Sequence, residues 1–238
     1  MAKRGKKYRE AVAKIETDKL YGPKAGFSLL KEIDQTTYDV TVECAFRLGI
    51  DPRKADQMVR GAVSLPHGIG KEVRVAVVAT GDKAAEAREA GADHVGDDDL
   101  VELLGQGDLL DEIDSVIATP DMMGKLGRLG KSLGPRGLMP NPKSGTVTMN
   151  VAQAVTEIKS GRVEYRADRN GNVHAVLGKA SFATEQLVEN YTALLEEIMR
   201  QRPSAAKGRY IRSASVSTSA SPSIPLDPAK ARDLLEEE

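Results

Sequence analysis

The stretch Val73-Arg-Val-Ala-Val-Val-Ala79 divides this 238-residue chain into two kinds of sequence. It is a nearly continuous aliphatic run, typical of a strand that is buried on both faces of a sheet. Helix-like segments follow at 83–90, about 97–104 and about 108–113, and then a second buried run, Ser115-Val-Ile-Ala-Thr119. Because strands alternate with helices here, we expect a Rossmann-like α/β domain with a parallel sheet over residues 70–159.

The sequence before this middle segment has a different pattern. From Tyr38 to Phe46, apolar and polar side chains alternate, as in a strand with one buried face. Arg60–Leu65 resembles a second strand, and an amphipathic helix is expected at about 6–19.

The sequence after the middle segment alternates again. Two such runs, at 163–167 and 173–177, flank Asp168-Arg-Asn-Gly-Asn172, and the Asn-Gly pair predicts a hairpin between them. An amphipathic helix at 183–200 and a strand at 210–216 follow.

These patterns predict a fold of mixed class, α/β and α+β. The two ends of the chain, residues 1–69 and 160–226, are expected to form one discontinuous two-layer α+β domain. The Rossmann-like α/β domain at 70–159 is inserted into it. The acidic segment 227–238 is expected to be a disordered tail.

Composition excludes several classes of protein. No run of about 18 apolar residues occurs, and the N-terminal residues lack an apolar signal core, so we expect a cytoplasmic protein without a membrane partner. The single cysteine, Cys44, cannot form an internal disulfide. His67, His94 and His174 do not have metal-ligand spacing, so neither a metal nor a cofactor is expected.

Charge is distributed unevenly although the formal net charge is only −1. Residues 75–117 hold 2 Lys/Arg and 12 Asp/Glu, whereas residues 118–159 hold 6 and 2. A chain of this kind can present a positive surface to a polyanion while its total charge stays near zero. An ordinary solvated acidic face, or a protein-interaction surface on the acidic segment, explains the same pattern.

The run Gly124–Gly145 combines repeated glycines and three prolines with five basic residues. A phosphate-binding P-loop would need glycine at Lys125, and a dinucleotide site would need more glycine than Thr80-Gly-Asp provides. The remaining functional interpretation is a rigid basic loop against a nucleic-acid backbone; the alternative is a loop kept soluble by its charge. The basic side chains are Lys125, Arg128, Lys131, Arg136 and Lys143.

Gly124–Pro142, with the core Lys-Ser-Leu-Gly-Pro-Arg-Gly-Leu-Met-Pro-Asn-Pro-Lys, resembles the signature segment of the bacterial large-subunit ribosomal protein one family. Four further blocks of sequence resemble the same family: Leu48–Gly61, Val63–Gly70, Gly178–Phe182 and Lys207–Ser213. The resemblance covers about residues 5–225.

The resemblance implies a non-enzymatic, ribosome-associated protein that is a monomer when free of the ribosome. Its implied partners are the ribosomal RNA stalk beside the tRNA exit site, the exit-site tRNA, whose release after deacylation it assists, and its own operon messenger RNA, whose translation it represses. A mononucleotide-dependent enzyme built on the inserted domain is the rival hypothesis, because fold alone does not decide function.

The resemblance also places the tight RNA contact in the discontinuous domain. Thr41 and Glu43 share one strand face and could bind ribose 2′-hydroxyls, although a solvated strand face would look the same. Tyr38 is either part of the core or a stacking ring at the strand end. Arg166 and Arg169, beside the predicted hairpin turn, are candidate phosphate contacts or ordinary surface arginines.

A second implied contact is the loop Ser217–Pro222. Ser217, Thr218, Ser219 and Ser221 offer hydroxyl donors there. The loop departs from the family pattern, because Ala220-Ser221 stands where Met-Gly is expected. The basic run in the inserted domain is then an auxiliary contact.

Overall fold

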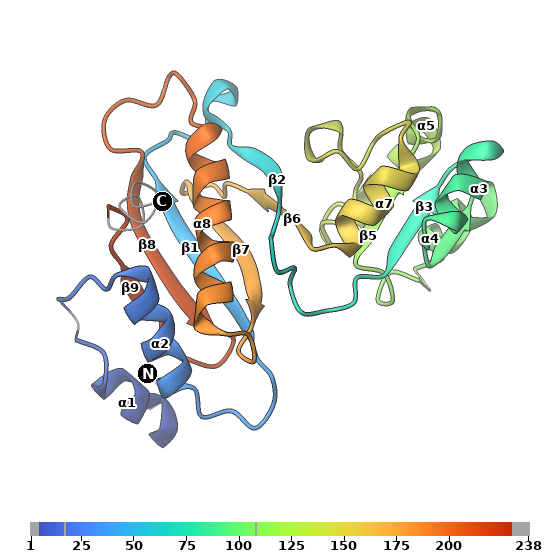
Figure 1. The fold of residues 1–238 in the computed structure, drawn as a ribbon. Coiled ribbons are helices and arrows are strands. Elements are labelled where there is room, and N and C mark those ends of the chain that lie inside the picture. The colour runs from blue at the N-terminus through green and yellow to red at the C-terminus, as the bar shows by residue number, and fades with distance from the viewer. Residues whose placement is uncertain (1–4, 17, 108, 230–238) are drawn as a thin grey trace. The chain divides into compact units, whose positions relative to one another are not determined.

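The structure is a computed structural model that describes residues 5–16, 18–107 and 109–229. The chain divides into two compact units (Figure 1). The terminal unit contains the described residues up to Gly70 together with those from Val163 onward, and the inserted unit is Lys71–Arg162. Most of the acidic tail expected at 227–238 lies outside the described residues.

The terminal unit is built on a four-stranded antiparallel sheet in the order β7-β1-β8-β9. β1 (Thr41–Leu48) is central and pairs with β7 (Asn172–Lys179) on one side and β8 (Ile211–Thr218) on the other. β9 (Ile224–Leu226), which the sequence did not predict, extends the sheet beside β8.

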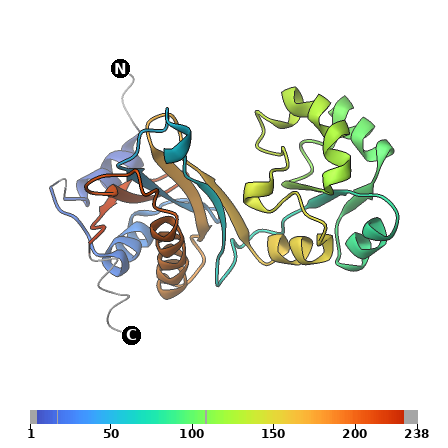
Figure 2. The ribbon, with the colours of Figure 1, turned by 90° about the horizontal axis from the view of Figure 1, so that it is seen from above.

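Two helices, α2 (Pro23–Ile33) and α8 (Thr184–Arg200), cover one face of this sheet (Figures 1 and 2). The alternation predicted from Tyr38 is confirmed within β1, because Val42, Cys44 and Phe46 are buried beneath the helices; the strand begins only at Thr41, however, and Tyr38 is exposed. The predicted apolar stripe of α8 is also confirmed: all of its members are buried in this core, namely Leu187, Tyr191, Leu194, Leu195 and Ile198.

Two predictions for the terminal unit were wrong. The first helix, α1 (Lys6–Ala13), is shorter than the expected 6–19. The expected hairpin at 163–177 keeps its turn, where Asp168 N donates to Asn172 O at 2.8 Å, but its strands separate after one isolated bridge. Instead β6 (Arg162–Arg166) pairs with β2 (Arg60–Ser64) in a two-stranded sheet. A short helical turn, η1 (Ala55–Gln57), precedes β2.

A buried amide fixes the chain just before it leaves the terminal unit at Gly70. The side-chain oxygen of Asn190, on α8, accepts a hydrogen bond from His67 N at 3.1 Å. Its amide nitrogen donates to Gly68 O at 3.0 Å and to Leu177 O at 2.7 Å. The connecting segment is therefore held against both α8 and β7.

The inserted unit has the predicted parallel sheet, in the order β4-β3-β5. Its strands are β3 (Val75–Val78), whose four residues are all buried, β4 (His94–Gly96) and β5 (Ser115–Ala118). On one face pack α3 (Asp82–Glu89) and α7 (Val151–Lys159). On the other face packs α4 (Asp98–Gln106), together with the glycine-rich run.

The glycine-rich run is not the loop that its composition predicted. It coils into short helical turns because Leu126, Leu133 and Leu138 are buried in the core of the inserted unit. These turns are α5 (Met123–Leu126), η3 (Gly127–Leu129), α6 (Gly130–Leu133) and η4 (Pro142–Ser144), and η2 (Pro120–Met122) comes directly before them. The helix expected at 108–113 is also wrong, because its described residues form turns.

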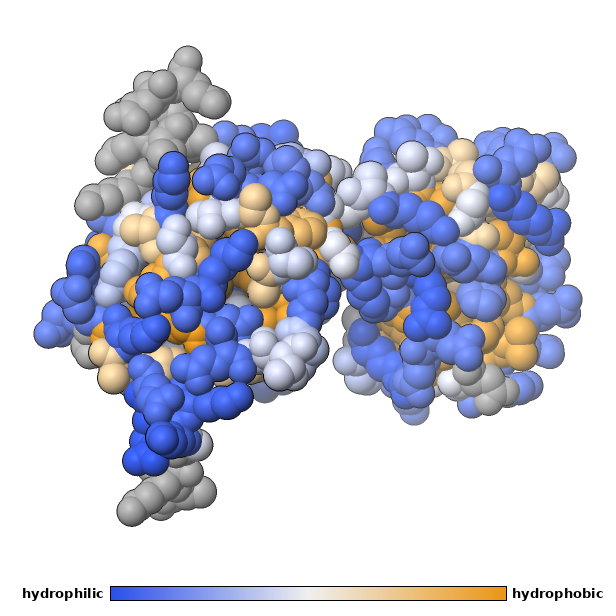
Figure 3. Space-filling view, turned by 60° about the horizontal axis from the view of Figure 1, so that its bottom comes forward, coloured by the Kyte–Doolittle hydropathy of each residue, from blue (hydrophilic) through white to orange (hydrophobic). Residues whose placement is uncertain are grey.

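Hydrophilic side chains predominate on the face drawn in Figure 3, with small apolar patches between them in both units. Within the described part of the chain, no helix is both long and apolar enough to span a bilayer.

Candidate nucleic-acid interface

The face of the four-stranded sheet opposite α2 and α8 carries the predicted strand residues. Because successive side chains alternate across a strand, Thr41, Glu43 and Arg47 of β1 point away from the buried face. Glu43 and Arg47 are exposed, and Thr41 is half-buried. The whole side of the sheet opposite α2 and α8 is called the open face below.

Strand register brings the predicted residues of β1 and β8 together. Glu43 lies directly opposite Ser217 of β8, and Thr41 lies opposite Lys179 of β7. Lys179 Nζ donates to Thr41 Oγ1 at 3.1 Å, while Ser219 N donates to the carbonyl oxygen of Thr41 at 3.2 Å. One end of the open face therefore presents hydroxyl, carboxylate and ammonium groups side by side.

The hydroxyls of the loop after β8 divide into two kinds. Thr218 is buried, and its Oγ1 accepts from Ser221 N at 3.1 Å. Ser221 Oγ in turn accepts from Thr218 N at 2.9 Å and donates to Pro222 O at 3.0 Å. These two side chains hold the turn. Ser217 and Ser219 remain the more accessible donors, half-buried and exposed respectively.

Tyr38 lies on the surface just before β1, with 64% of its area exposed, so it is not a core residue. Its neighbour Asp39 accepts hydrogen bonds from Ser181 N at 2.9 Å and Ser181 Oγ at 2.8 Å. This carboxylate anchors the segment to the connection between β7 and α8. The Tyr38 ring is therefore available to stack on a base.

Arg166 and Arg169 are exposed, but the structure does not bring Arg169 to the Thr41 end of the sheet. The turn that carries Arg169 contacts the opposite end of β1, where Leu48 N donates to Gly171 O at 2.8 Å. Thr41 and Leu48 are seven positions apart on β1, or roughly 23 Å. A single RNA could therefore contact both Arg169 and Thr41 only if it extended along the length of the sheet.

Two of the five basic residues in the glycine-rich run are paired with acids of the inserted unit. Lys125 forms an ion pair with Asp98 at the start of α4, and Arg136 pairs with Asp111 at 2.5 Å. Within the described residues, the other three have no ion-pair partner and are exposed: Arg128, Lys131 and Lys143. Fewer cations of this run are therefore available to a polyanion than its composition indicates.

The described residues contain no group of three His, Cys, Asp or Glu side chains that could hold a metal ion. Cys44 lies under the helices, and burial raises the pKa of its thiol, which disfavours a nucleophilic thiolate.

Comparison with known proteins decides the family. The sequence profile of the ribosomal protein L1p/L10e family matches residues 29–222. The chain is 61% identical over 236 residues to the large ribosomal subunit protein uL1 of Streptomyces virginiae, covering 99% of this chain and 98% of that protein. The uL1 protein of Thermobifida fusca is 58% identical over 231 residues, or 97% of each chain. The chain belongs to the ribosomal protein L1p/L10e family.

Membership of this family confirms the resemblance drawn from Gly124–Pro142 and the expected mixed two-domain fold. It also removes the rival hypothesis, because the L1p/L10e proteins are ribosomal proteins and not mononucleotide-dependent enzymes.

The open face of this L1p/L10e member contains residues that sequence reasoning missed. Lys179 contacts Thr41 directly, and Ser213 and Ser215 continue the row of Ser217 along β8. The alternation of serine with apolar residues in 211–218 was a usable signal for the two serines. The position of Lys179 beside Thr41 depends on the register between β1 and β7, which the local sequence does not encode.

Proposed function

We propose that this protein is a constituent of the large ribosomal subunit that binds a folded stalk of ribosomal RNA through the terminal unit. The observation that carries the proposal is the assembly of Thr41, Glu43, Ser217 and Ser219 at one end of the open face. Small hydroxyls let an RNA backbone approach closely, and Glu43 can accept from ribose 2′-hydroxyls, which distinguish RNA from DNA.

The neighbouring groups support the same surface. Lys179 adds a cation that can meet a phosphate, and exposed Tyr38 adds a ring. Arg166 and Arg169 would contact phosphates further along the RNA. The glycine-rich run of the inserted unit, through Arg128, Lys131 and Lys143, would add an auxiliary contact to the backbone.

Binding to a stalk fragment of large-subunit ribosomal RNA, compared with an unstructured RNA of equal length over a salt series, tests the proposal. We expect the folded fragment to bind at least about tenfold more tightly at 150 mM salt, because shape recognition adds to the phosphate term. Equal affinity for both RNAs at every salt concentration would contradict specific recognition.

Matched variants then locate the contact. Thr41→Ala and Ser217→Ala should each weaken stalk binding about five- to tenfold, corresponding to the loss of ~1 kcal/mol for one hydrogen bond. Thr41→Ser keeps the hydroxyl and should bind nearly as well as the unchanged protein. Ser213→Ala is the control for Ser217, because it lies on the same strand roughly 13 Å away. Equal losses for Ser213→Ala and Ser217→Ala would remove this end of the sheet from the interface.

We also propose the finer roles that the family resemblance implies, which are release of deacylated tRNA from the exit site and repression of the protein's own operon messenger. If one surface serves both RNAs, the messenger leader should compete with the stalk fragment, and Thr41→Ala should weaken both complexes in parallel. Dissociation of deacylated tRNA from ribosomes with and without the protein tests the other role; equal rates would contradict it.

A further inference from the structure

The parallel sheet of the inserted unit is covered at one edge and open at the other. At the β5 edge, Ala118 N donates to Thr146 O at 2.9 Å. At the β4 edge, no strand of the described residues pairs with the outer side of β4. Ala79 N donates to Gly96 O at 3.0 Å, so the carbonyl of Gly96 faces β3. Because successive residues of a strand direct their peptide groups to opposite edges, the N–H and C=O of Val95 face outward, where a further strand could pair with them.

A groove of about 600 Å³ lies along this open edge, within the inserted unit, and β4 forms its floor. One wall comes from α3, which contributes Ala84 and Arg88, and the other from α4, which contributes Asp99 and Leu103. In each wall the two residues are four positions apart, so they share one face of their helix. Leu103 is 41% exposed, although the other two leucines of α4 are buried. The groove therefore offers apolar surface together with one charge of opposite sign on each wall.

The charge around this groove is predominantly negative. Asp97 and Asp99 line it at the start of α4, and within the described residues neither has an ion-pair partner. Asp93 also lines it and is paired with Lys159 at 3.1 Å. The surrounding segment 75–117 holds 2 Lys/Arg and 12 Asp/Glu. A surface of this kind repels RNA phosphates and attracts cationic groups.

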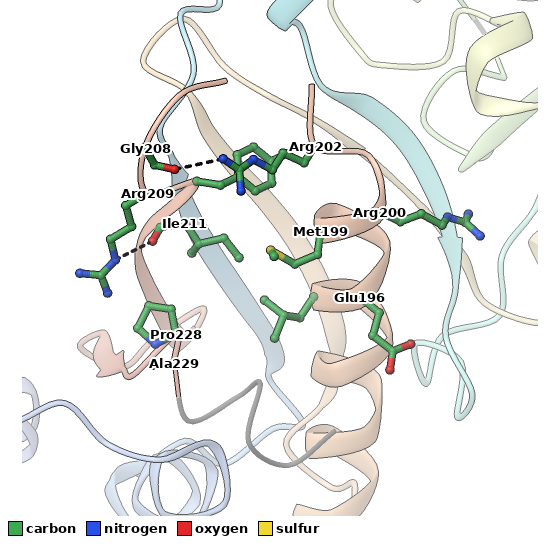
Figure 4. Close-up of a pocket in the computed structure, with 11 residues that line it drawn as sticks. Glu196, Met199, Arg200, Arg202, Gly208, Arg209, Ile211, Pro228 and Ala229 are labelled. Atoms are coloured by element: carbon green, nitrogen blue, oxygen red, sulfur yellow. Dashed lines mark hydrogen bonds between the residues drawn. The ribbon is translucent and has the colours of Figure 1, made fainter. Parts of the chain in front are cut away.

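The terminal unit presents the opposite charge in a pocket between α8 and β8 (Figure 4). Three arginines and one glutamate are among its lining residues: Arg200, Arg202, Arg209 and Glu196. The dashed lines in Figure 4 mark hydrogen bonds from Arg202 to Gly208 O and from Arg209 to Ile211 O, each at 3.1 Å. The described charges of this pocket disfavour a cationic ligand, whereas those of the groove along β4 favour one.

We propose that the groove along β4 docks an extended, lysine-rich segment of a partner protein, which adds a strand to the open edge. Side chains of an added strand alternate between the two faces of the sheet, and therefore between the two walls. On the α4 wall, a lysine stem covers Leu103 while its ammonium group reaches Asp99. On the α3 wall, a small apolar side chain contacts Ala84, since Arg88 repels a second cation there. The groove thus favours lysine alternating with a small apolar residue.

Titration of the full chain with the peptide Lys-Val-Lys-Val-Lys at about 150 mM salt, followed through the backbone amide signals in NMR spectra, tests the proposal. The matched control peptide is Lys-Lys-Lys-Val-Val, which has the same composition and charge without the alternation. The alternating peptide should shift the amide signals of Val95 and of its neighbours in the groove. It should also bind at least about fivefold more tightly than the control, because only its lysines all point to one wall.

Variants of the protein locate the contact. Asp99→Lys should weaken binding of the alternating peptide at least about tenfold, since it removes a charge-assisted hydrogen bond and adds a like charge. Leu103→Gln should weaken binding about threefold or more without any change in charge, because apolar contact is lost. The control is Asp121→Lys, the same change at an exposed aspartate directly after β5. It should alter affinity less than about twofold, since β5 lies two strand spacings, or about 10 Å, from β4 and salt screens charges at that distance.

Equal affinities of the two peptides would show that charge alone drives binding, and would overturn the proposal. Equal losses in Asp99→Lys and Asp121→Lys would also overturn it, as would a titration in which the amide signals of the groove do not move. Movement of the same signals on addition of the ribosomal RNA stalk fragment alone would assign the groove to RNA, and would contradict a protein partner.

Discussion

Tyr191 lies at the centre of the terminal unit's core, stacked on Phe46 at 5.4 Å between ring centroids and edge-on to Phe27 at 5.9 Å. Within the described residues its buried hydroxyl has no hydrogen-bond partner, and burial raises the pKa of this phenol. An unpaired buried hydroxyl opposes folding, since its bonds to water are lost. We expect Tyr191→Phe to leave the free energy of unfolding unchanged or to raise it by up to about 1 kcal/mol.

Urea unfolding measures this effect. Tyr191→Ala is the control for the ring, and it should lower the free energy of unfolding by about 3–5 kcal/mol. A loss above about 1 kcal/mol in Tyr191→Phe would show instead that the hydroxyl contributes a hydrogen bond.

Asp168 determines the turn that carries Arg169. Its Oδ1 accepts from Asn170 N and Asn172 N, each at 2.8 Å. These bonds, led by the one from Asn172, favour the carboxylate and lower the pKa of Asp168. A lowered pKa in the folded state stabilises the protein above the unfolded value of about 4, and this contribution is lost as the pH falls below it.

Because solvent screens the charge of Asp168, we expect Asp168→Ala to cost about 1 kcal/mol at pH 7, from the loss of its hydrogen bonds to the turn, and less at pH 3. Urea midpoints of the variant and the unchanged protein at both pH values check the prediction. The same cost at both pH values would mean that the turn does not depend on the charged carboxylate.

At the scale of elements, ion pairs moderate the charge of the glycine-rich run. Lys125 and Arg136 are held by Asp98 and Asp111, and these pairs are largely exposed, so they add little stability. Replacing both acids by asparagine should free two cations for RNA phosphates. The slope of log affinity against log salt should then steepen by about one to two, while stability changes by less than about 1 kcal/mol.

The control for this prediction is Asp99→Asn with Glu112→Gln, which changes net charge equally at neighbouring acids that have no ion-pair partner within the described residues. Filter binding of both double variants over a salt series separates local release of the two cations from a general change in charge. An identical slope in the two variants would show that the ion pairs do not restrain the run.

Elements whose pattern is local were predictable from the sequence, and those set by distant partners were not. The apolar residues of α8 recur at helical spacing, and those of β3 form a continuous run, so both elements can be identified from their own sequence. α2 was missed because Gly22-Pro23 and Gly26 look like breaks. Gly26 leaves room for the buried side chain of Leu226, which would have to shift if a Cβ were present, since that Cβ would lie 2.3 Å from Leu226 Cδ2.

The candidate site shows the same division between local and distant information. Thr41 and Glu43 were found from a local motif, and their alternation placed both on one face. Lys179 and the separation of Arg169 from Thr41 follow from strand register and from which strand pairs with which, and both depend on contacts over 100 residues apart. The pairing of β6 with β2 in place of a hairpin has the same origin.

At the scale of the whole molecule, each unit has its own apolar core. The cluster that contains Phe27, Phe46 and Tyr191 draws only on the terminal unit. The two clusters on either side of β3 draw only on the inserted unit. Because no buried apolar cluster of the described residues spans both units, the terminal unit should fold without the inserted one.

This independence predicts the outcome of excising residues 71–162 and joining Gly70 to Val163 by a short glycine-serine linker. Thr41, Glu43, Ser217 and Ser219 all remain, so affinity for the stalk fragment should fall by less than about tenfold. The salt dependence should become shallower, because the free cations Arg128, Lys131 and Lys143 are removed. Titration with the stalk fragment measures the affinity, and circular dichroism establishes that the shortened protein is folded. A folded terminal unit that fails to bind would place the main contact on the inserted unit instead.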